Sequence, residues 1–171
     1  MKCIKKLVAL TLAAVLALAM LTACSGSGAQ LNTKLADDVA ATVNSVRSDS
    51  KKAALKRVPK VEALFAEVAK AEAMFAADKS DANRQKVIEA QKNALSALKN
   101  VEIDGRKVDA AATSRFFKLS HDLKDVSQLK ATNNWRDAFV LSNAEYLAVV
   151  CADYNGHNGI VMVGIVLESA E

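Results

Sequence analysis

Histidine and cysteine are scarce in this chain. The 171 residues include only two histidines and three cysteines. A structural zinc site needs four nitrogen or sulfur ligands at characteristic spacings, and the sequence contains no such cluster. We therefore expect no metal site in this protein.

The sequence also lacks the short motifs by which many enzymes can be identified. It contains no glycine-rich phosphate loop, no serine-nucleophile elbow and no paired-carboxylate motif. Each of these motifs places specific groups for a specific chemical step. Their absence argues against an enzyme without excluding one.

A histidine and carboxylates stand close together once, at His121, Asp122 and Asp125. On a helix, His121 and Asp125 would share a face because they are four positions apart. The pair supplies two metal ligands at most, so we interpret it as the solvated polar face of an amphipathic helix.

The segment from Asp153 to His157 begins like a calcium loop, with Asp153, Asn155 and His157 at alternate positions. The EF-hand loop needs glycine at its sixth position and glutamate at its twelfth. Asn158 and Gly164 occupy those positions here. We therefore interpret the segment as a turn.

A thiol triad of Cys151, Asp153 and His157 is a further candidate arrangement. Cys151 and Asp153 would share a strand face because they are two residues apart. No oxyanion-hole motif accompanies them in the sequence. A cysteine hydrolase is therefore disfavoured, and an enzyme that uses His121 or His157 ranks last among the hypotheses.

The amino terminus carries a single long apolar run. Lysines at positions 2, 5 and 6 precede 14 apolar or small residues from Leu7 to Met20. A transmembrane helix needs about 20 residues to cross roughly 30 Å of hydrocarbon, so this run is short for a span. A cationic start, a short apolar run and small residues at a cleavage point are typical of a secretory signal.

The run ends in Leu21-Thr22-Ala23-Cys24. This stretch resembles the lipobox of bacterial lipoprotein signal peptides, a resemblance confined to residues 1–24. It implies removal of residues 1–23 as a signal peptide, a diacylglyceryl thioether on Cys24 and an acylated (palmitate-type) amino terminus. Multiple acyl chains give stable anchoring, because each buried CH₂ contributes about 0.8 kcal/mol. The implied location is the extracytoplasmic face of the cell membrane; an uncleaved anchor or a plain secretory leader is the alternative.

Removal of the leader would change the charge and the thiols of the chain. The whole chain has 23 basic and 19 acidic residues, so the loss of three lysines leaves 20 against 19 over 148 residues. A nearly neutral chain has no electrostatic footprint for nucleic acid, and we expect no nucleic-acid partner. Cys151 would be the only unmodified thiol, which excludes an intrachain disulfide. Its apolar neighbours favour burial.

The mature chain is long enough for one domain. Residues 24–30 comprise the lipidated cysteine and a short flexible tether rich in glycine and serine, and residues 31–171 form a single domain. Apolar residues recur every three or four positions in stretches that start near Leu31, Leu55 and Val87, which predicts three helices. The second and third are expected to form an antiparallel hairpin across a short link.

Three further features of this helical region are open to interpretation. Pro59, the only proline, lies inside the second apolar stripe, and we favour a kink in a longer helix over a helix start. Ile103-Asp104-Gly105-Arg106 predicts a turn, either within a small strand pair or within a loop. Apolar spacing from Phe116 to Leu129 predicts a fourth, shorter helix.

The carboxyl-terminal part has a different character. Residues 146–152 and 160–167 are rich in β-branched side chains, and residues 153–159 between them contain two Asn-Gly pairs. This pattern predicts a β-hairpin with a longer loop. A helix capped at Ser142-Asn143-Ala144-Glu145 is the alternative. The predicted fold class is α+β: antiparallel helices over about 31–130 and a small β-hairpin over about 145–167.

Both faces of such a hairpin would be apolar, so both must be covered. One predicted face comprises Leu147, Val149, Cys151, Val161, Val163 and Ile165, and the other comprises Val150, Ala152, Ile160, Met162 and Val166. The helices can cover one face. The second face needs Trp135, Phe139 and their surroundings, or a partner chain.

The sequence therefore predicts a lipid-anchored, non-catalytic partner-binding or scaffold module of the cell envelope. Its partners would be the membrane, through the lipid on Cys24, and another protein or a second copy of itself; no cofactor besides that lipid is expected. The alternative is a small-ligand or cell-wall-binding lipoprotein. Its pocket would be lined by Trp135, Tyr146, Tyr154 and His157.

Overall fold

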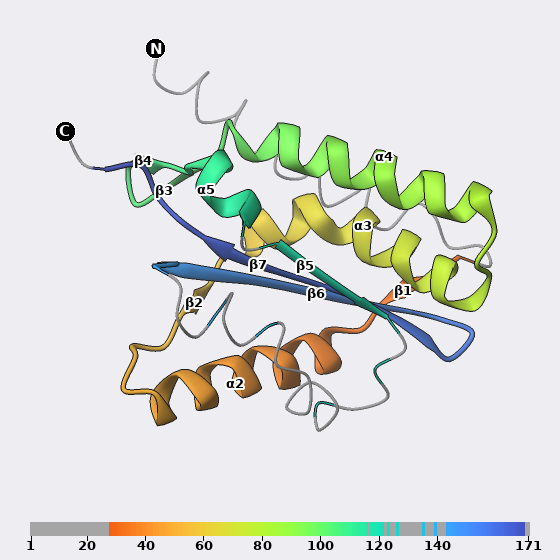
Figure 1. The fold of residues 1–171 in the computed structure, drawn as a ribbon, viewed down its shortest axis with the longest axis horizontal. Coiled ribbons are helices and arrows are strands. Elements are labelled where there is room, and N and C mark those ends of the chain that lie inside the picture. The colour runs from red at the N-terminus through yellow and green to blue at the C-terminus, as the bar shows by residue number, and fades with distance from the viewer. Residues whose placement is uncertain are drawn as a thin grey trace, which may run out of the picture.

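The computed structural model describes residues 28–115, 117–121, 123, 126, 135, 139 and 143–169. Its helices are α2 (Thr33–Asp49), α3 (Pro59–Ala77), α4 (Asp81–Leu98) and the short α5 (Ala110–Arg115). Helices and a mainly antiparallel sheet together confirm the predicted α+β class (Figure 1). Within the described residues, no helix has the length and apolar character needed to cross a membrane.

One mixed sheet forms the centre of the molecule. Its strands are β1 (Gln30–Leu31), β2 (Lys56–Arg57), β5 (Phe117–His121), β6 (Tyr146–Tyr154) and β7 (His157–Ile165). β6 and β7 form a long antiparallel hairpin, and β5 pairs antiparallel with the outer side of β7. Both short strands lie along the other side of β6, β1 antiparallel near the hairpin turn and β2 parallel at the far end.

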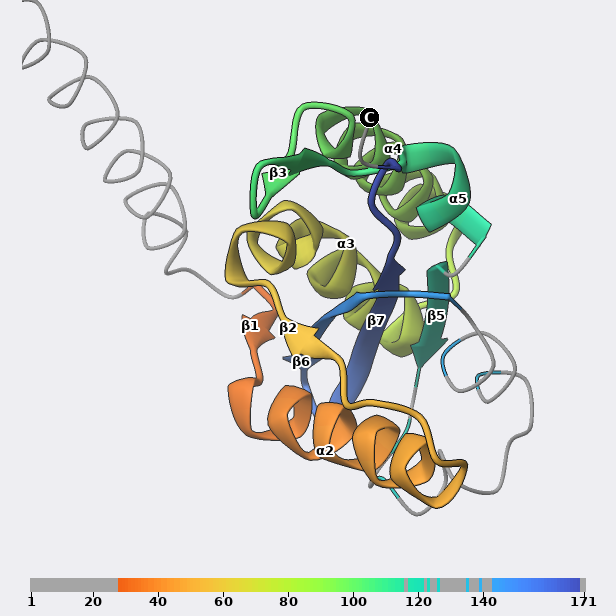
Figure 2. The same cartoon turned by 90° about the vertical axis from the view of Figure 1, so that its left-hand side faces the viewer.

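The sheet lies between helical layers (Figures 1 and 2). α3 packs on one face, and α4 packs on the outer side of α3. α2 packs on the opposite face, where Trp135 and Phe139 are buried in the same apolar cluster. The expectation that Trp135 and Phe139 help to cover the second face is therefore confirmed.

The hairpin is confirmed, and the helix alternative is wrong, because Tyr146–Tyr154 form the strand β6. The loop is shorter than expected: only Asn155 and Gly156 form the turn, with φ of 53° and 81°. Two-residue hairpin turns of this kind need positive φ at both central residues, which Asn-Gly provides.

The two-residue turn also corrects the predicted faces. The register pairs Val150 with Val161 and Cys151 with Ile160. One face therefore carries Leu147, Val149, Cys151, Ile160 and Met162, and the other carries Ala148, Val150, Ala152, Val161, Val163 and Ile165. Grouping Val161 with Leu147 was wrong, because a shift of one residue in register moves every side chain to the opposite face.

Pro59 is the first residue of α3, so the predicted kink is wrong. The preceding Val58 is extended, with φ −123° and ψ 92°, because a residue before proline is disfavoured in the helical region. Leu55 and Val58 are nevertheless buried. They reach the core from the extended segment around β2, outside the helix. Their spacing continues the apolar pattern of α3 only by coincidence.

The predicted helix over 116–129 is wrong at residues 117–121, which form β5. Phe117 and Leu119 lie two positions apart on one face of this strand, and both pack against the cluster on the α3 face. His121 ends the strand opposite Gly159, so His121 does not begin a helical metal-ligand pair. Asp122 and Asp125 lie outside the described residues.

The turn predicted at Asp104-Gly105 belongs to a strand pair. β3 (Glu102–Ile103) and β4 (Arg106–Lys107) form a separate two-stranded sheet. Asp104 and Gly105 have φ of 52° and 79°. Of the two interpretations, the small strand pair is confirmed.

Candidate functional site

The outer edge of β6 carries a polar arrangement that links separate elements of the fold. β1 pairs with Ala152 and Asp153, and β2 pairs with Tyr146 and Leu147, so the two short strands leave a gap between them. A strand edge exposes backbone N–H and C=O groups that can pair with another chain. The gap therefore needs other partners for its backbone groups.

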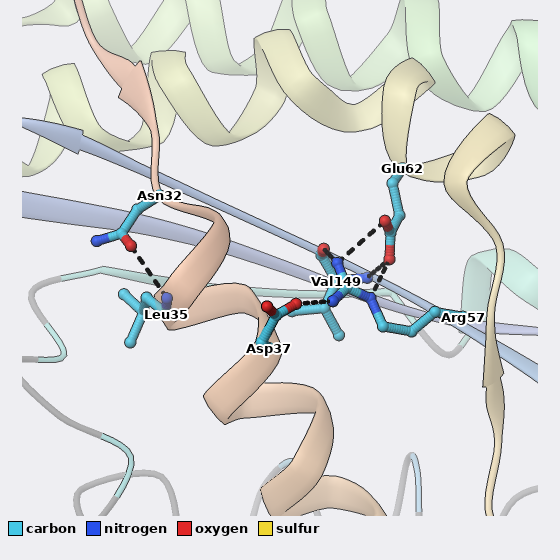
Figure 3. Close-up of polar contacts among 6 residues, drawn as sticks. All are labelled: Asn32, Leu35, Asp37, Arg57, Glu62 and Val149. Carbon is cyan, nitrogen blue, oxygen red and sulfur yellow. Dashed lines mark hydrogen bonds and ion pairs between the residues drawn. The ribbon is translucent and has the colours of Figure 1, made fainter.

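Two side chains supply those partners at Val149, in the middle of the gap. The Val149 N–H donates to Glu62 Oε1 at 3.2 Å, and Arg57 Nη2 donates to the Val149 carbonyl at 3.3 Å (Figure 3). Glu62 belongs to the first turn of α3, and Arg57 to β2. Together they take the place of one strand residue and close the edge of the sheet.

Arg57 and Glu62 hold one another in a two-pronged ion pair. Arg57 Nε lies 2.6 Å from Glu62 Oε1, and Arg57 Nη2 lies 3.0 Å from Glu62 Oε2. Paired N–H···O⁻ bonds of this kind combine charge with fixed geometry. Arg57 Nη1 also donates to Asp37 of α2. The hydrogen bonding of Arg57 to the Glu62 carboxylate, which accepts, is the main cause that raises the pKa of Arg57, and burial opposes it.

This arrangement joins four elements of the fold: α2, β2, α3 and β6. Sequence reasoning missed Arg57 and Glu62 because a kinked helix through Pro59 would have placed Glu62 in a helix interior. A helix that starts at Pro59 places Glu62 in its first turn, where a carboxylate is favoured by the helix dipole. A helix start at Pro59, read from the sequence, would therefore have pointed to Glu62.

A shallow groove lies further along the same edge, beside the hairpin turn. Its volume is about 750 Å³. It is lined by residues of β1 and the start of α2, and by the end of β6: Gly28, Gln30, Leu31, Asn32, Thr33, Lys34, Asp153, Tyr154 and Asn155. Binding pockets for small molecules span about 300–1,000 Å³. This groove is of that size, and its lining is mostly polar.

The structure does not bring the four predicted pocket residues together. Tyr146 and Tyr154 occupy the two ends of β6, about 26 Å apart at 3.3 Å per residue. Both pack against the α3-side cluster, whereas Trp135 is buried on the α2 side. Tyr154 and His157 are direct cross-strand neighbours, and of the four only Tyr154 lines the groove.

Tyr146 instead links the β3–β4 pair to the central sheet through a hydrogen bond. Its hydroxyl donates to Asp104, and this hydrogen bond is the main cause that raises the pKa of Tyr146. The neighbouring Glu145 accepts two hydrogen bonds from Arg106, at 2.7 and 3.1 Å. Both contacts link the turn of the small hairpin to the start of β6.

Cys151 is buried on the α2 side of the sheet. Burial is the main cause that raises the pKa of its thiol to about 12. A thiol needs its thiolate form to act as a nucleophile. His157 pairs with Tyr154, whose side chain lies on the opposite face from Cys151, so the structure does not assemble a thiol triad.

Within the described part of the chain, no three His, Cys, Asp or Glu residues are grouped so that they could hold a metal ion. Comparison of the chain with protein-family models, with curated proteins and with solved structures finds no match. A function must therefore be argued from the residues and their geometry.

Proposed function

We propose that this protein is a lipid-anchored partner-binding or scaffold module on the extracytoplasmic face of the cell membrane. The lipobox-like stretch ending at Cys24 is the basis of the anchor. The observation that carries the proposal is that the sheet begins at Gln30, six residues after Cys24. Six residues span at most about 20 Å. A domain on so short a tether stays against the membrane surface.

The position of β1 supports one orientation of the domain on the membrane within this proposal. β1 lies beside the Asn155-Gly156 turn, at the end of the molecule that also holds the start of α2 and the link between α3 and α4 (Figure 1). The β3–β4 pair and α5 lie at the opposite end. In this proposal the first end faces the membrane, and the second end and the long sides are presented to partners.

The anchor is tested on Cys24, with Cys151 as the matched control. We expect the native protein to lack residues 1–23 and to carry acyl chains on Cys24, measured by mass spectrometry of its amino-terminal peptide. Cys24→Ser should abolish the modification and incorporation of a labelled fatty acid. Cys151→Ser should leave both unchanged, because this thiol is buried. An unmodified Cys24 in the native protein would refute the anchor.

The groove beside β1 supports a second candidate function, the binding of a small polar ligand or a cell-wall fragment. Tyr154 lines this groove and Tyr146 lies at the far end of the same strand. In a thermal-shift screen of metabolites and glycans, a groove ligand should raise Tm in the wild type and in Tyr146→Ala but not in Tyr154→Ala. A ligand response that survives Tyr154→Ala would show that the groove is not its site.

A further inference from the structure

α4 is the outermost layer of the domain. It packs on α3 through residues that include the buried Ala94 and Leu98. The rest of its surface has no role in covering the sheet, which α3 already covers (Figure 1). A helix of 18 residues is about 27 Å long at 1.5 Å per residue, which is enough to lie along a partner helix.

One flank of α4 combines one exposed and one half-buried apolar side chain with cations. Ile88 is 49% exposed, the highest value among the described large apolar side chains, and Leu95 is half-buried one heptad further on. They lie in a shallow groove of about 520 Å³, lined by Ile88, Gln91, Lys92, Leu95, Ser96 and Lys99. No acidic residue lines this groove.

The spacing of the apolar and cationic residues along this flank suits packing against a second helix. Ile88 and Leu95 are seven residues apart, and so are Lys92 and Lys99. In paired helices, apolar residues that repeat every seven positions form the seam, and charges beside the seam select the partner. The flank thus has the residue pattern of one side of a short helix–helix interface with a cationic border.

The two lysines are available to a partner. Within the described ranges, no carboxylate forms an ion pair with Lys92 or Lys99, whereas Lys34 and Lys70 pair with Asp38 and Glu67 on their own helices. Opposite charge across an interface raises the association rate and excludes partners of like charge. Two unneutralised lysines beside an apolar seam therefore favour a partner that brings carboxylates.

We propose that this flank of α4 docks an acidic amphipathic helix of another protein, an inference that rests on the partner-binding function proposed above. The partner helix places apolar residues seven apart against Ile88 and Leu95, and glutamate or aspartate against Lys92 and Lys99. A second copy of α4 fits poorly, because it would oppose lysine with lysine. A membrane surface fits poorly too, because interfacial helices present a broad apolar face rather than two side chains.

The test uses the full-length lipoprotein in detergent micelles and a designed helical probe peptide with leucine seams bordered by glutamate. Fluorescence anisotropy should show salt-sensitive binding of this peptide. Binding to the Lys92→Glu/Lys99→Glu variant should weaken at least tenfold. The matched control, Lys52→Glu/Lys56→Glu, makes the same charge change at exposed positions near β2 and should bind as the wild type does. A probe with lysine in place of glutamate should not bind.

Three results would overturn the proposal. The first is no binding of the glutamate probe, or equal weakening in the control variant. The second is flotation with phosphatidylglycerol-containing vesicles that depends on Lys92 and Lys99 in the Cys24→Ser protein, which would assign the flank to lipid. The third is a dimer in sedimentation experiments that Ile88→Ser dissociates. If Cys24 proves to be acylated while the probe fails to bind, the anchor stands and only the α4 site is refuted.

Discussion

Replacing Gly159 with alanine is expected to destabilise the protein by about 3 kcal/mol, the upper end of the usual cost of overpacking a core. A Cβ at this position would lie 2.2 Å from the Ala69 carbonyl oxygen and 2.4 Å from the Ala73 nitrogen. Both are backbone atoms of α3 and cannot turn aside as a side chain can. The helix would have to move away from the sheet, which loosens the larger of the two apolar clusters among the described residues.

Urea denaturation of the two proteins measures this difference. Gly156→Ala is the control, because a Cβ there meets nothing within 4 Å and only the positive φ of 81° opposes it. That strain costs roughly 1–2 kcal/mol, clearly less than the Gly159 variant. If the two variants were equally stable, the close approach of α3 to β7 at Gly159 would not determine how much an added Cβ destabilises the protein.

The second large effect is expected at the edge of β6. Glu62→Ala removes the acceptor of the Val149 N–H and the main partner of Arg57 together. Leaving the Val149 N–H and the Arg57 Nε–H without an acceptor in a partly buried place costs about 1–3 kcal/mol each, so we expect a loss of about 3 kcal/mol in the free energy of unfolding. The Val149 amide should also lose its protection in native-state hydrogen exchange.

Glu67→Ala is the matched control on the same helix. Glu67 also pairs with a cation, Lys70, but its side chain is 72% exposed, against 17% for Glu62. Exposed ion pairs contribute about 0–1 kcal/mol, and the Val149 amide should stay protected. A Glu62→Ala protein with wild-type stability and an unchanged Val149 amide would show that the sheet edge is closed by something other than this ion pair.

Much of the fold class was predictable from local pattern. Apolar residues at three- and four-residue spacing marked the long helices, because a helix brings such positions onto one face. Clusters of β-branched residues around Asn-Gly marked the hairpin, because Asn and Gly tolerate positive φ. The need for Trp135 and Phe139 on the second face followed from the apolar character of both strand faces. Each of these signals lies within a few neighbouring residues.

Other features depend on contacts between distant residues. The spacing around Phe117 and Leu119 suits a helix as well as a strand, and pairing with β7 selected the strand. The extended backbone before Pro59 is held by pairing of β2 with β6. The candidate site was missed for the same reason, since Arg57 and Glu62 meet Val149 across about ninety residues of sequence.

Composition and periodicity thus specify the long helices, the strands of the hairpin and the burial of their apolar faces, because these are properties of neighbouring side chains. The amino-terminal motif predicts the anchor at Cys24 in the same local way. Strand register, the choice of strand at residues 117–121 and the closure of the β6 edge came from the assembled fold. They depend on hydrogen bonds and packing between segments far apart in the chain, which no local pattern encodes.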